Sequence, residues 1–347
     1  MRKIVFVTGH LTGGGSERVL TLIANSMLKQ GFDVSIITFA EPSESYENSC
    51  KVYKLEFSND FNQISNLRKL IKQIKAEVVI AFEYYVAIKT VFATRGMNCK
   101  VIVSERNDPN MLNSLLKKKM RNLAYLWADI LVCQTDDAKK YFSKRTQKHT
   151  VVIPNPIKKD LPVWNGSVFN KRIINFCRLE KQKNIPLLIR AFKEVYQKHP
   201  DYTLLIYGNG SEKEYITKYI NEQQLAESVQ LSNFIDNIHD IAASCSMFVS
   251  SSDYEGISNS MLESMAIGLP VVCTDCPIGG AKMMINDNEN GLLVPCNQEN
   301  ALASAMCKII ENPLLANKLS SNAKKIRENL SLENITMMWI SLFEEKN

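Results

Sequence analysis

Two glutamates in the second half of the chain lie eight positions apart, around the start of a predicted helix. Glu255 follows the apolar run Met247–Val249, which predicts a short buried strand, and Glu263 lies eight positions later, in a helix that begins near Asn259. Ligands of open α/β sheets bind at the carboxyl ends of the strands, so these carboxylates could hold sugar hydroxyls. The backbone N–H groups that could face an anion there are those of Gly256, Ile257, Ser258 and Asn259.

Both glutamates also have a purely structural explanation. Ser260 and Glu263 have the spacing of a capping box, in which the Glu263 side chain would reach back and close the helix N-terminus. Glu255 would then be a solvated loop acid. The rest of the chain has to decide between the two interpretations.

Two cations follow the first predicted strand of the same half. The strand Arg172–Cys177 ends in a loop that carries Arg178 and Lys183. Such cations could make charge-assisted contacts to a diphosphate. The alternative is a solvated loop with ordinary surface cations.

Further loops of interest also follow predicted strands. Gly13–Ser16 opens a helix and could approach a phosphate, although it matches neither the dinucleotide fingerprint nor the P-loop, and a tight turn explains it equally well. Tyr207–Ser211 is another turn at such an edge. Asn233–Asp236, which includes Phe234 and Ile235, could offer backbone groups to a flat base. Together, these loops favour a nucleotide-type ligand.

Several classes of protein lose support from absent motifs and from composition. The sequence has no His-Glu-x-x-His, no Gly-x-Ser-x-Gly and no Asp-x-Asp pair, so we expect neither a metal ion nor a cofactor. The net charge of +6 suits phosphate ligands, nucleic acid or acidic lipid equally well, and we expect no nucleic-acid partner. The nine scattered cysteines are typical of reduced thiols in a cytosolic protein, and the Cys273/Cys276 pair has no nearby His or second pair to complete a metal site.

The elements that must position these residues alternate along the whole chain. Predicted strands in the first half are Lys3–Thr8, Asp33–Phe39, Lys51–Leu55, Glu77–Phe82, Lys100–Ser104, Ile130–Cys133 and Thr150–Ile153. Those in the second half are Arg172–Cys177, Thr203–Tyr207, Val229–Leu231, Met247–Val249, Pro270–Cys273 and Gly291–Val294. Amphipathic helices such as Ser16–Gln30 lie between them, which predicts doubly wound parallel sheets. The proline-containing stretch 154–170 reads as a linker, so we expect two similar α/β domains, 1–160 and 161–330, that face a cleft.

One predicted helix, Met111–Trp127, is basic and amphipathic. It places leucines, methionines and Trp127 at helical spacing and carries Lys117, Lys118, Lys119 and Arg121 without an acid. These features suit the surface of an anionic membrane, whereas the alternative is packing on its own domain. The apolar part of the N-terminus is too short for a signal peptide and no run approaches the ~20 residues of a membrane span, so we expect a soluble or peripherally attached protein.

Taken together, these residues resemble the retaining glycosyltransferases of family 4, whose GT-B fold has two Rossmann-like domains facing a cleft. The resemblance covers nearly the full length. In chain order, the motifs that carry it are Gly13–Arg18, Ser104–Asp108, Asn155–Pro156, Arg178–Asn184, Glu255 with Glu263, Pro270–Val272 and Asn290–Pro295. The glutamate pair with the Gly268–Val272 run after it is the specific part.

The resemblance implies roles at the phosphates of a nucleotide sugar. Gly14 and Gly15 should lie near the donor phosphate and the reacting sugar. Arg178 and Lys183 should clamp the diphosphate and stabilise the leaving nucleotide without a metal.

It also implies roles at the sugar, the ribose and the base. Glu255 should bind hydroxyls of the transferred sugar, helped by the amides of Gly256–Asn259, and Glu263 should bind the ribose. Backbone of Phe234 and Ile235 should meet the base. By the same resemblance, domain 1–160 binds the acceptor, domain 161–330 binds the sugar nucleotide, and residues 331–347 pack back on the first domain.

The sequence departs from the family pattern at three places. Arg106 stands where similar enzymes often carry His, and because a guanidinium accepts no proton at neutral pH we assign it only binding in the vicinity of sugar and acceptor. Cys177 replaces the usual glycine before Arg178. Met283 replaces an acid that is common near Gly280 and Ala281, which leaves the role of that loop open.

The resemblance implies transfer of a hexose or N-acetylhexosamine from a nucleotide sugar, with UDP as the expected carrier. The acceptor would be a saccharide or an undecaprenyl-diphosphate-linked saccharide in capsule, exopolysaccharide or lipid-linked oligosaccharide synthesis, and the enzyme would lie peripherally on the cytoplasmic face of the membrane. A sugar-nucleotide epimerase of the same architecture is one alternative. A non-catalytic sugar-nucleotide-binding membrane adaptor is another.

Overall fold

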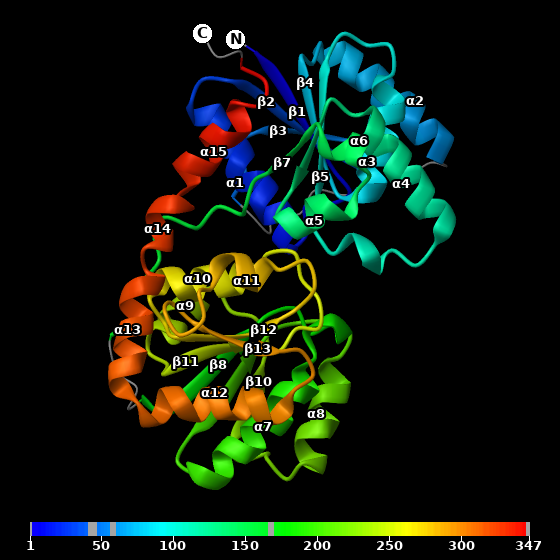
Figure 1. Cartoon of the computed structure of the whole chain (residues 1–347). Coiled ribbons are helices and arrows are strands. Elements are labelled where there is room, and N and C mark those ends of the chain that lie inside the picture. Colours follow the sequence, from blue (N-terminus) through cyan, green and yellow to red (C-terminus); the bar gives the residue numbers. More distant parts are fainter. Residues whose placement is uncertain (1, 41–46, 56–59, 166–169, 345–347) are drawn as a thin grey trace. The chain divides into compact units, whose positions relative to one another are not determined.

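The computed structural model describes residues 2–40, 47–55, 60–165 and 170–344. The chain divides into two compact units (Figure 1). Unit 1 contains Met1–Pro156 and Leu330–Asn347, and unit 2 contains Ile157–Asn329. In each unit, helices cover both faces of a parallel sheet.

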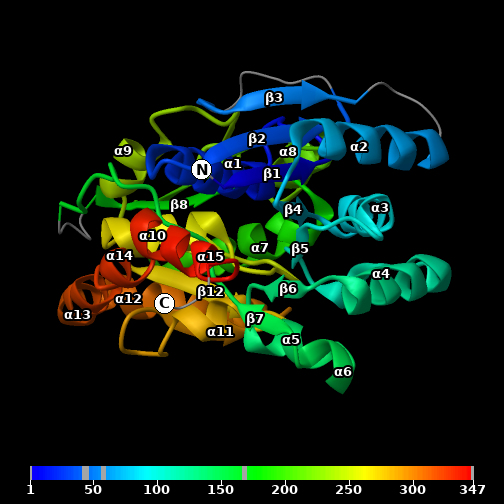
Figure 2. The same ribbon diagram turned by 90° about the horizontal axis from the view of Figure 1, so that it is seen from above.

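Unit 1 is built on a seven-stranded sheet. Its strands are β1 (Lys3–Thr8), β2 (Asp33–Thr38), β3 (Lys51–Lys54), β4 (Val78–Phe82), β5 (Lys100–Glu105), β6 (Ile130–Cys133) and β7 (Thr150–Val152). Their order is β3-β2-β1-β4-β5-β6-β7, which Figure 2 shows running across the unit, and the described pairings are all parallel. The strand order reverses between β1 and β4, which makes this the switch point where such sheets bind ligands.

Helices on the two faces of the unit 1 sheet come from different parts of the chain. On one face, α1 (Gly15–Lys29) packs against α15 (Leu332–Ile340); on the other lie α2 (Asp60–Ile74), α3 (Tyr84–Thr94) and α4 (Leu115–Trp127) (Figure 1). The shorter helices are η1 (Pro109–Met111), α5 (Asp136–Tyr141) and α6 (Lys144–Gln147). On α15, Trp339 is fully buried and stacks on Phe82 of β4, with ring centroids 5.5 Å apart.

Unit 2 has a six-stranded parallel sheet with the same kind of reversal. Its strands are β8 (Arg172–Phe176), β9 (Thr203–Tyr207), β10 (Val229–Ser232), β11 (Met247–Ser250), β12 (Val271–Asp275) and β13 (Leu292–Pro295). Their order is β10-β9-β8-β11-β12-β13, so the switch point lies between β8 and β11. The predicted strands are therefore all confirmed, with ends that differ by at most two residues, because most of them are short apolar runs bounded by turn residues.

Helices cover the unit 2 sheet in two layers (Figure 1). On one face lie α7 (Ile185–Lys198), α8 (Lys213–Glu222) and α12 (Glu299–Glu311), and on the other lie α9 (Ile238–Ala243) and α10 (Asn259–Ile267). The remaining helices are η3 (Lys181–Lys183), α11 (Gly280–Met284), α13 (Pro313–Ala323) and α14 (Ile326–Asn329).

The stretch predicted as a linker is only partly one. Ile157, Leu161 and Trp164 are buried in unit 2, and the Trp164 indole N–H donates to the carbonyl of Cys245 at 2.8 Å. Arg327 donates to the carbonyl of Pro162 at 2.7 Å and anchors the same stretch. Sparse apolar residues concealed this packing in the sequence. Residues 166–169 of the predicted linker lie outside the described residues.

Candidate active site

The predicted cation loop and the predicted glutamate loop meet at the switch point of unit 2. The first follows β8 and the second follows β11, and these two strands are neighbours in the sheet. Asp253 N–H donates to the carbonyl of Gln182 at 2.9 Å, and the Ser251 hydroxyl donates to the carbonyl of Lys183 at 2.9 Å. These bonds join the two loops into one surface.

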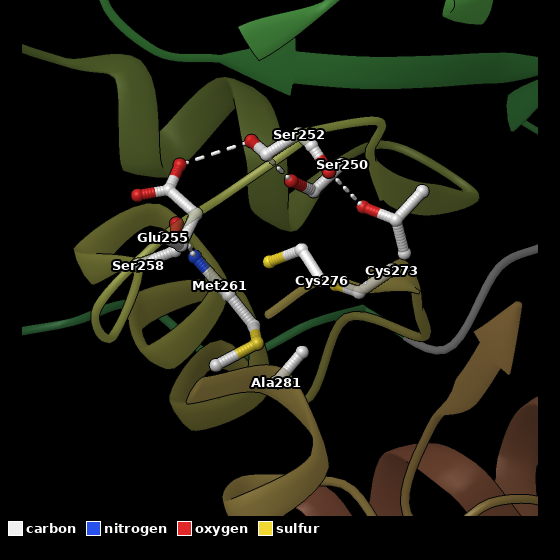
Figure 3. A pocket seen from close by; sticks show the side chains of 9 residues that line it. Ser250, Ser252, Glu255, Ser258, Met261, Cys273, Cys276 and Ala281 are labelled. Carbon is white, nitrogen blue, oxygen red and sulfur yellow. Dashed lines mark hydrogen bonds between the residues drawn. The ribbon is translucent and has the colours of Figure 1, made fainter. Parts of the chain in front are cut away.

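Glu255 lies at the centre of this surface, in an ion pair with Lys183. Its carboxylate also accepts from the Ser252 hydroxyl at 2.9 Å and from the Gln182 amide at 3.2 Å. Figure 3 shows Glu255 and Ser252 in a small pocket that Met261, Cys273 and Cys276 also line. Glu255 is therefore an oriented, partly desolvated acid and not a solvated loop residue.

The Glu255 carboxylate favours the charged form of Lys183. Burial alone would lower the pKa of Lys183, but the adjacent Glu255 carboxylate outweighs it and the pKa is raised above its ordinary value. Only 13% of each side chain is exposed. Cys177, which replaces the usual glycine, is held as a neutral thiol because burial raises its pKa to about 12.

Local backbone geometry explains how the cation loop is positioned. Asn184 adopts a left-handed conformation with φ of 43° and caps α7, accepting from Leu187 N–H at 3.3 Å. A Cβ at Gly208 would lie 2.0 Å from the carbonyl oxygen of Cys177, so only glycine lets that turn approach the loop. Arg178 is exposed, and its side chain makes no hydrogen bond or ion pair with the described residues. It is the cation that is available to a ligand.

The N-terminus of α10 is built differently from the capping box considered above. Ser258 is the N-cap, and its hydroxyl accepts from Met261 N–H at 3.4 Å. The capping interpretation of Ser260 and Glu263 is therefore wrong, because the helix begins two residues earlier than that box requires. Glu263 instead pairs with His239 Nε2 at 2.9 Å, a partner that sequence reasoning missed.

The remaining predicted donor contacts lie at the same edge of the sheet. Gly256 and Ile257 are buried just before the N-cap, and Gly280 packs so closely that an added Cβ would meet the Gly256 carbonyl oxygen at 1.6 Å. Phe234 and Ile235 follow β10, and 49% of Phe234 is exposed. An exposed ring at the end of a strand is compatible with contact to a base.

Gly14 and Gly15 lie in unit 1, beside a cluster that the sequence analysis did not identify. Gly14 is the N-cap of α1, and a Cβ there would lie 1.9 Å from a carboxylate oxygen of Glu17. Glu17 in turn pairs with His10 at 3.1 Å. The proposed place of both glycines near a donor phosphate stays a prediction, since Gly14 already has a structural reason in the room it gives Glu17.

Glu83 completes this cluster at the switch point between β1 and β4. It has a φ of 70°, which is rare for a residue other than glycine. Burial and the charge of Glu17 raise the pKa of its carboxyl group.

Two groups of side chains among the described residues have ligand atoms close enough for a metal ion. One is His10 with Glu17 and Glu83, and the other is His199 with Cys307 and Glu311; in each, the atoms lie within 4.8 Å of one another. Neither group includes a predicted diphosphate ligand. Independence from metal stays a prediction.

Arg106 follows β5 and is held as a planar cation. It lies over the Phe82 ring, 4.8 Å from the centroid, and donates to the side-chain oxygen of Asn155. Burial lowers its pKa to about 9, which still leaves the guanidinium charged at neutral pH. Its Nε and Nη1 are buried without a hydrogen-bond partner among the described residues, which suits an anionic or hydroxyl ligand.

The basic amphipathic helix differs in two respects from the prediction. It begins at Leu115 and not at Met111, because Ser114 caps it. Arg121 is not part of a solvated basic face: it is 1% exposed, lies 3.7 Å from Glu105 and donates to the carbonyl of Pro109 at 2.8 Å. Single-sequence reasoning missed this because the partners come from two other segments.

Ala124 and Tyr125 of α4 are buried, but one stripe of its apolar side chains is largely exposed. Leu116, Met120, Leu123 and Trp127 follow one another at helical spacing, and their exposed fractions run from 39% to 69%. Lys117 and Lys119 flank this stripe and are also exposed. Among the described residues, no helix is long and apolar enough to cross a membrane.

Comparison with known proteins decides the family. Residues 13–161 match the family described as Glycosyltransferase Family 4, and residues 166–326 match the family described as Glycosyl transferases group 1. The two matches follow each other along most of the chain and divide it much as the two units do. This chain belongs to the GT-B glycosyltransferases.

Similar proteins cover this glycosyltransferase almost completely. It is 27% identical to an uncharacterized glycosyltransferase of Haemophilus influenzae, over 98% of this chain and 99% of the relative. It is also 27% identical to the GalNAc-alpha-(1->4)-GalNAc-alpha-(1->3)-diNAcBac-PP-undecaprenol alpha-1,4-N-acetyl-D-galactosaminyltransferase of Campylobacter jejuni, over 99% of both chains.

Solved structures share the fold of this glycosyltransferase. TarM superposes with a TM-score of 0.86 at 16% identity, over 99% of both chains. HepE of Anabaena in complex with UDP and glucose superposes with a TM-score of 0.83 at 19% identity, over 98% of both chains. These values confirm the predicted two-domain GT-B architecture.

Proposed function

We propose that this glycosyltransferase moves a hexose or N-acetylhexosamine from a UDP-sugar to a lipid-linked saccharide, with retention of configuration. The observation that carries the proposal is the oriented Glu255–Lys183 pair beside the exposed Arg178 and the N-terminus of α10. It places an acid for sugar hydroxyls next to cations for a diphosphate. The undecaprenol-linked substrate named for the Campylobacter jejuni relative supports the acceptor class.

The proposed chemistry needs no metal on the diphosphate. The bond from the sugar C1 to the diphosphate oxygen breaks while a bond from C1 to the acceptor oxygen forms on the same face, and the acceptor proton passes to the leaving phosphate. Arg178 and Lys183 stabilise the charge that develops on that phosphate. Lys183 has three N–H donors, so it can keep its bond to Glu255 and still donate to a phosphate oxygen.

The proposal also gives the exposed stripe of α4 a partner. Four apolar side chains flanked by lysines fit the interface of an anionic membrane, where undecaprenol-linked substrates reside. In this proposal the enzyme lies peripherally on the cytoplasmic face, with saccharide or undecaprenyl-diphosphate-linked acceptors as partners.

A panel of donors tests the function directly. The purified enzyme is incubated with UDP- and GDP-linked hexoses and N-acetylhexosamines, with and without EDTA, and release of the nucleoside diphosphate is measured. We expect slow hydrolysis of one UDP-sugar, faster release when a lipid-linked saccharide is added, and no effect of EDTA. Conversion of the donor to its epimer without an acceptor would establish an epimerase instead, and donor binding without either reaction would establish an adaptor.

A further inference from the structure

The contact between His239 and Glu263 has no role in the proposal so far. His239 Nε2 lies 2.9 Å from a carboxylate oxygen of Glu263, and the exposed fractions of the two side chains are 14% and 6%. Ser258 caps α10, so this pair is not needed to close the helix N-terminus. Burial of a carboxylate costs desolvation free energy unless a hydrogen-bond partner compensates it, and His239 is such a partner.

Three separate segments hold the His239 ring in place. The residue lies on α9, which follows the loop with Phe234 and Ile235 after β10. The edge of its ring meets Phe176 of β8 with centroids 6.0 Å apart and planes at 86°, and Phe176 packs in turn on Phe248 of β11 at 5.2 Å. The imidazole is therefore held against β8 by Phe176, which β11 supports from behind, and its Nε2 lies within hydrogen-bond distance of Glu263.

We propose that His239 is a positioning residue for the ribose of the nucleotide, acting through Glu263. The inference rests on the proposed function, in which Glu263 binds the ribose. The Nε2–H group donates to one oxygen of the carboxylate and limits its rotation, so the carboxylate is already oriented when the ribose hydroxyls bind. Because an immobilised acceptor loses less conformational entropy on binding, the pair strengthens binding of ribonucleotides in particular.

This arrangement also predicts a preference for ligands that carry ribose hydroxyls. A site that accepts hydrogen bonds from ligand hydroxyls discriminates strongly against an analogue that lacks them, because its own buried polar groups are then unpaired. The ligand class is therefore a nucleoside diphosphate with free 2′ and 3′ hydroxyls, and His239 should matter only when those hydroxyls are present.

Calorimetric titration with UDP and with 2′,3′-dideoxy-UDP tests this coupling. The wild type is compared with His239→Leu, which removes the donor, and with His239→Gln, which keeps an N–H group at similar reach. We expect His239→Leu to weaken UDP about tenfold and dideoxy-UDP less than about threefold, and His239→Gln to stay within about threefold of the wild type for both. In turnover assays, His239→Leu should raise KM for the donor and leave kcat nearly unchanged.

The outcomes separate this inference from the proposed function. If the wild type binds UDP and His239→Leu weakens both ligands equally, or neither, His239 only packs the core and the inference is overturned. Thermal unfolding of each variant shows whether a general loss of structure explains an equal loss. If the wild type binds neither UDP nor dideoxy-UDP, the proposed donor is wrong, and the inference falls with it.

Discussion

Glu255 and Lys183 form an ion pair of which only 13% of each side chain is exposed, and the Glu255 carboxylate favours the charged form of Lys183. The three hydrogen-bonding groups around the carboxylate, from Gln182, Lys183 and Ser252, come from two loops, which leaves little freedom for its orientation. Stabilisation of a transition state requires such a fixed orientation, whereas binding of a substrate does not require it. In the proposed function, Glu263 in α10 has a different task, because it holds the ribose, a part of the ligand that does not react.

Substitution of the two glutamates should therefore give different kinetics. We expect Glu255→Gln to lower kcat about a hundredfold or more, because it weakens contacts that matter most at the reacting sugar. Glu263→Ala should raise KM for the donor about tenfold with a small effect on kcat. Steady-state kinetics with the preferred donor measure both. Equal losses of affinity with unchanged turnover would show that the roles are not divided in this way.

The stability of unit 1 should depend on pH through Glu83, because burial and the charge of Glu17 raise the pKa of its carboxyl group. The folded protein then holds this proton to higher pH than the unfolded chain does, so stability is lost as the pH rises above the ordinary carboxyl pKa. Glu83→Gln stays neutral and should be more stable than the parent by on the order of 1 kcal/mol at pH 8, with a smaller difference at pH 5.

The three tryptophans allow that measurement to report on unit 1 alone. In a Trp164→Phe background, the fluorescence of Trp127 and Trp339 follows unfolding of unit 1 in urea. Glu227→Gln, at an exposed position of unit 2, is the matched control. A stability difference for Glu83→Gln that is the same at both pH values would contradict the raised pKa.

At the scale of elements, α4 has one face that packs on unit 1 and one face that is exposed. Arg121 fixes it to unit 1 through Glu105 and Pro109, while Leu116, Met120, Leu123 and Trp127 remain exposed. If the apolar residues of α4 served only to pack the helix on its unit, this stripe would be buried. Charge reversal of Arg121 would therefore damage the fold and says nothing about a membrane.

Cosedimentation with vesicles that contain phosphatidylglycerol tests the exposed face. We expect the double variant Lys117→Glu with Lys119→Glu to reduce vesicle binding about tenfold or more, since each basic residue contributes about 1 kcal/mol near an anionic surface. Leu116→Glu should weaken binding to neutral and anionic vesicles alike. Leu314→Glu, at a leucine that is 82% exposed on α13, is the control. Undiminished binding by the α4 variants would assign the stripe to another partner.

Local elements were predictable from the sequence, and contacts between distant segments were not. Each strand is an apolar run with turn residues at its ends, so all could be found from local pattern alone. The start of α10 at Asn259 was predicted, but the alternative of a capping box at Ser260 is wrong, because Ser258 and Ser260 are both good caps and only the backbone decides between them. His239 and Arg121 escaped notice because their partners lie on other elements.

At the scale of the whole molecule, the same doubly wound plan occurs twice, and each copy concentrates its polar side chains at its switch point. In unit 2, the sequence predicted residues at the switch point, namely Arg178, Lys183 and the two glutamates. In unit 1 it led only to the glycines, because His10, Glu17 and Glu83 form no local motif and meet only when β1 and β4 pair. The predicted roles at the donor await the kinetic tests above.

The return of the chain to unit 1 through α15 has a consequence for biosynthesis. The seven strands of unit 1 are complete at Val152, but Phe82 meets Trp339, and Phe32 meets Phe343, only after the ribosome has translated all of Ile157–Asn329. At the usual ~5–20 residues per second, this takes roughly ten to thirty seconds. During that interval the nascent unit lacks the aromatic partners of Phe32 and Phe82, so part of its apolar surface is covered last.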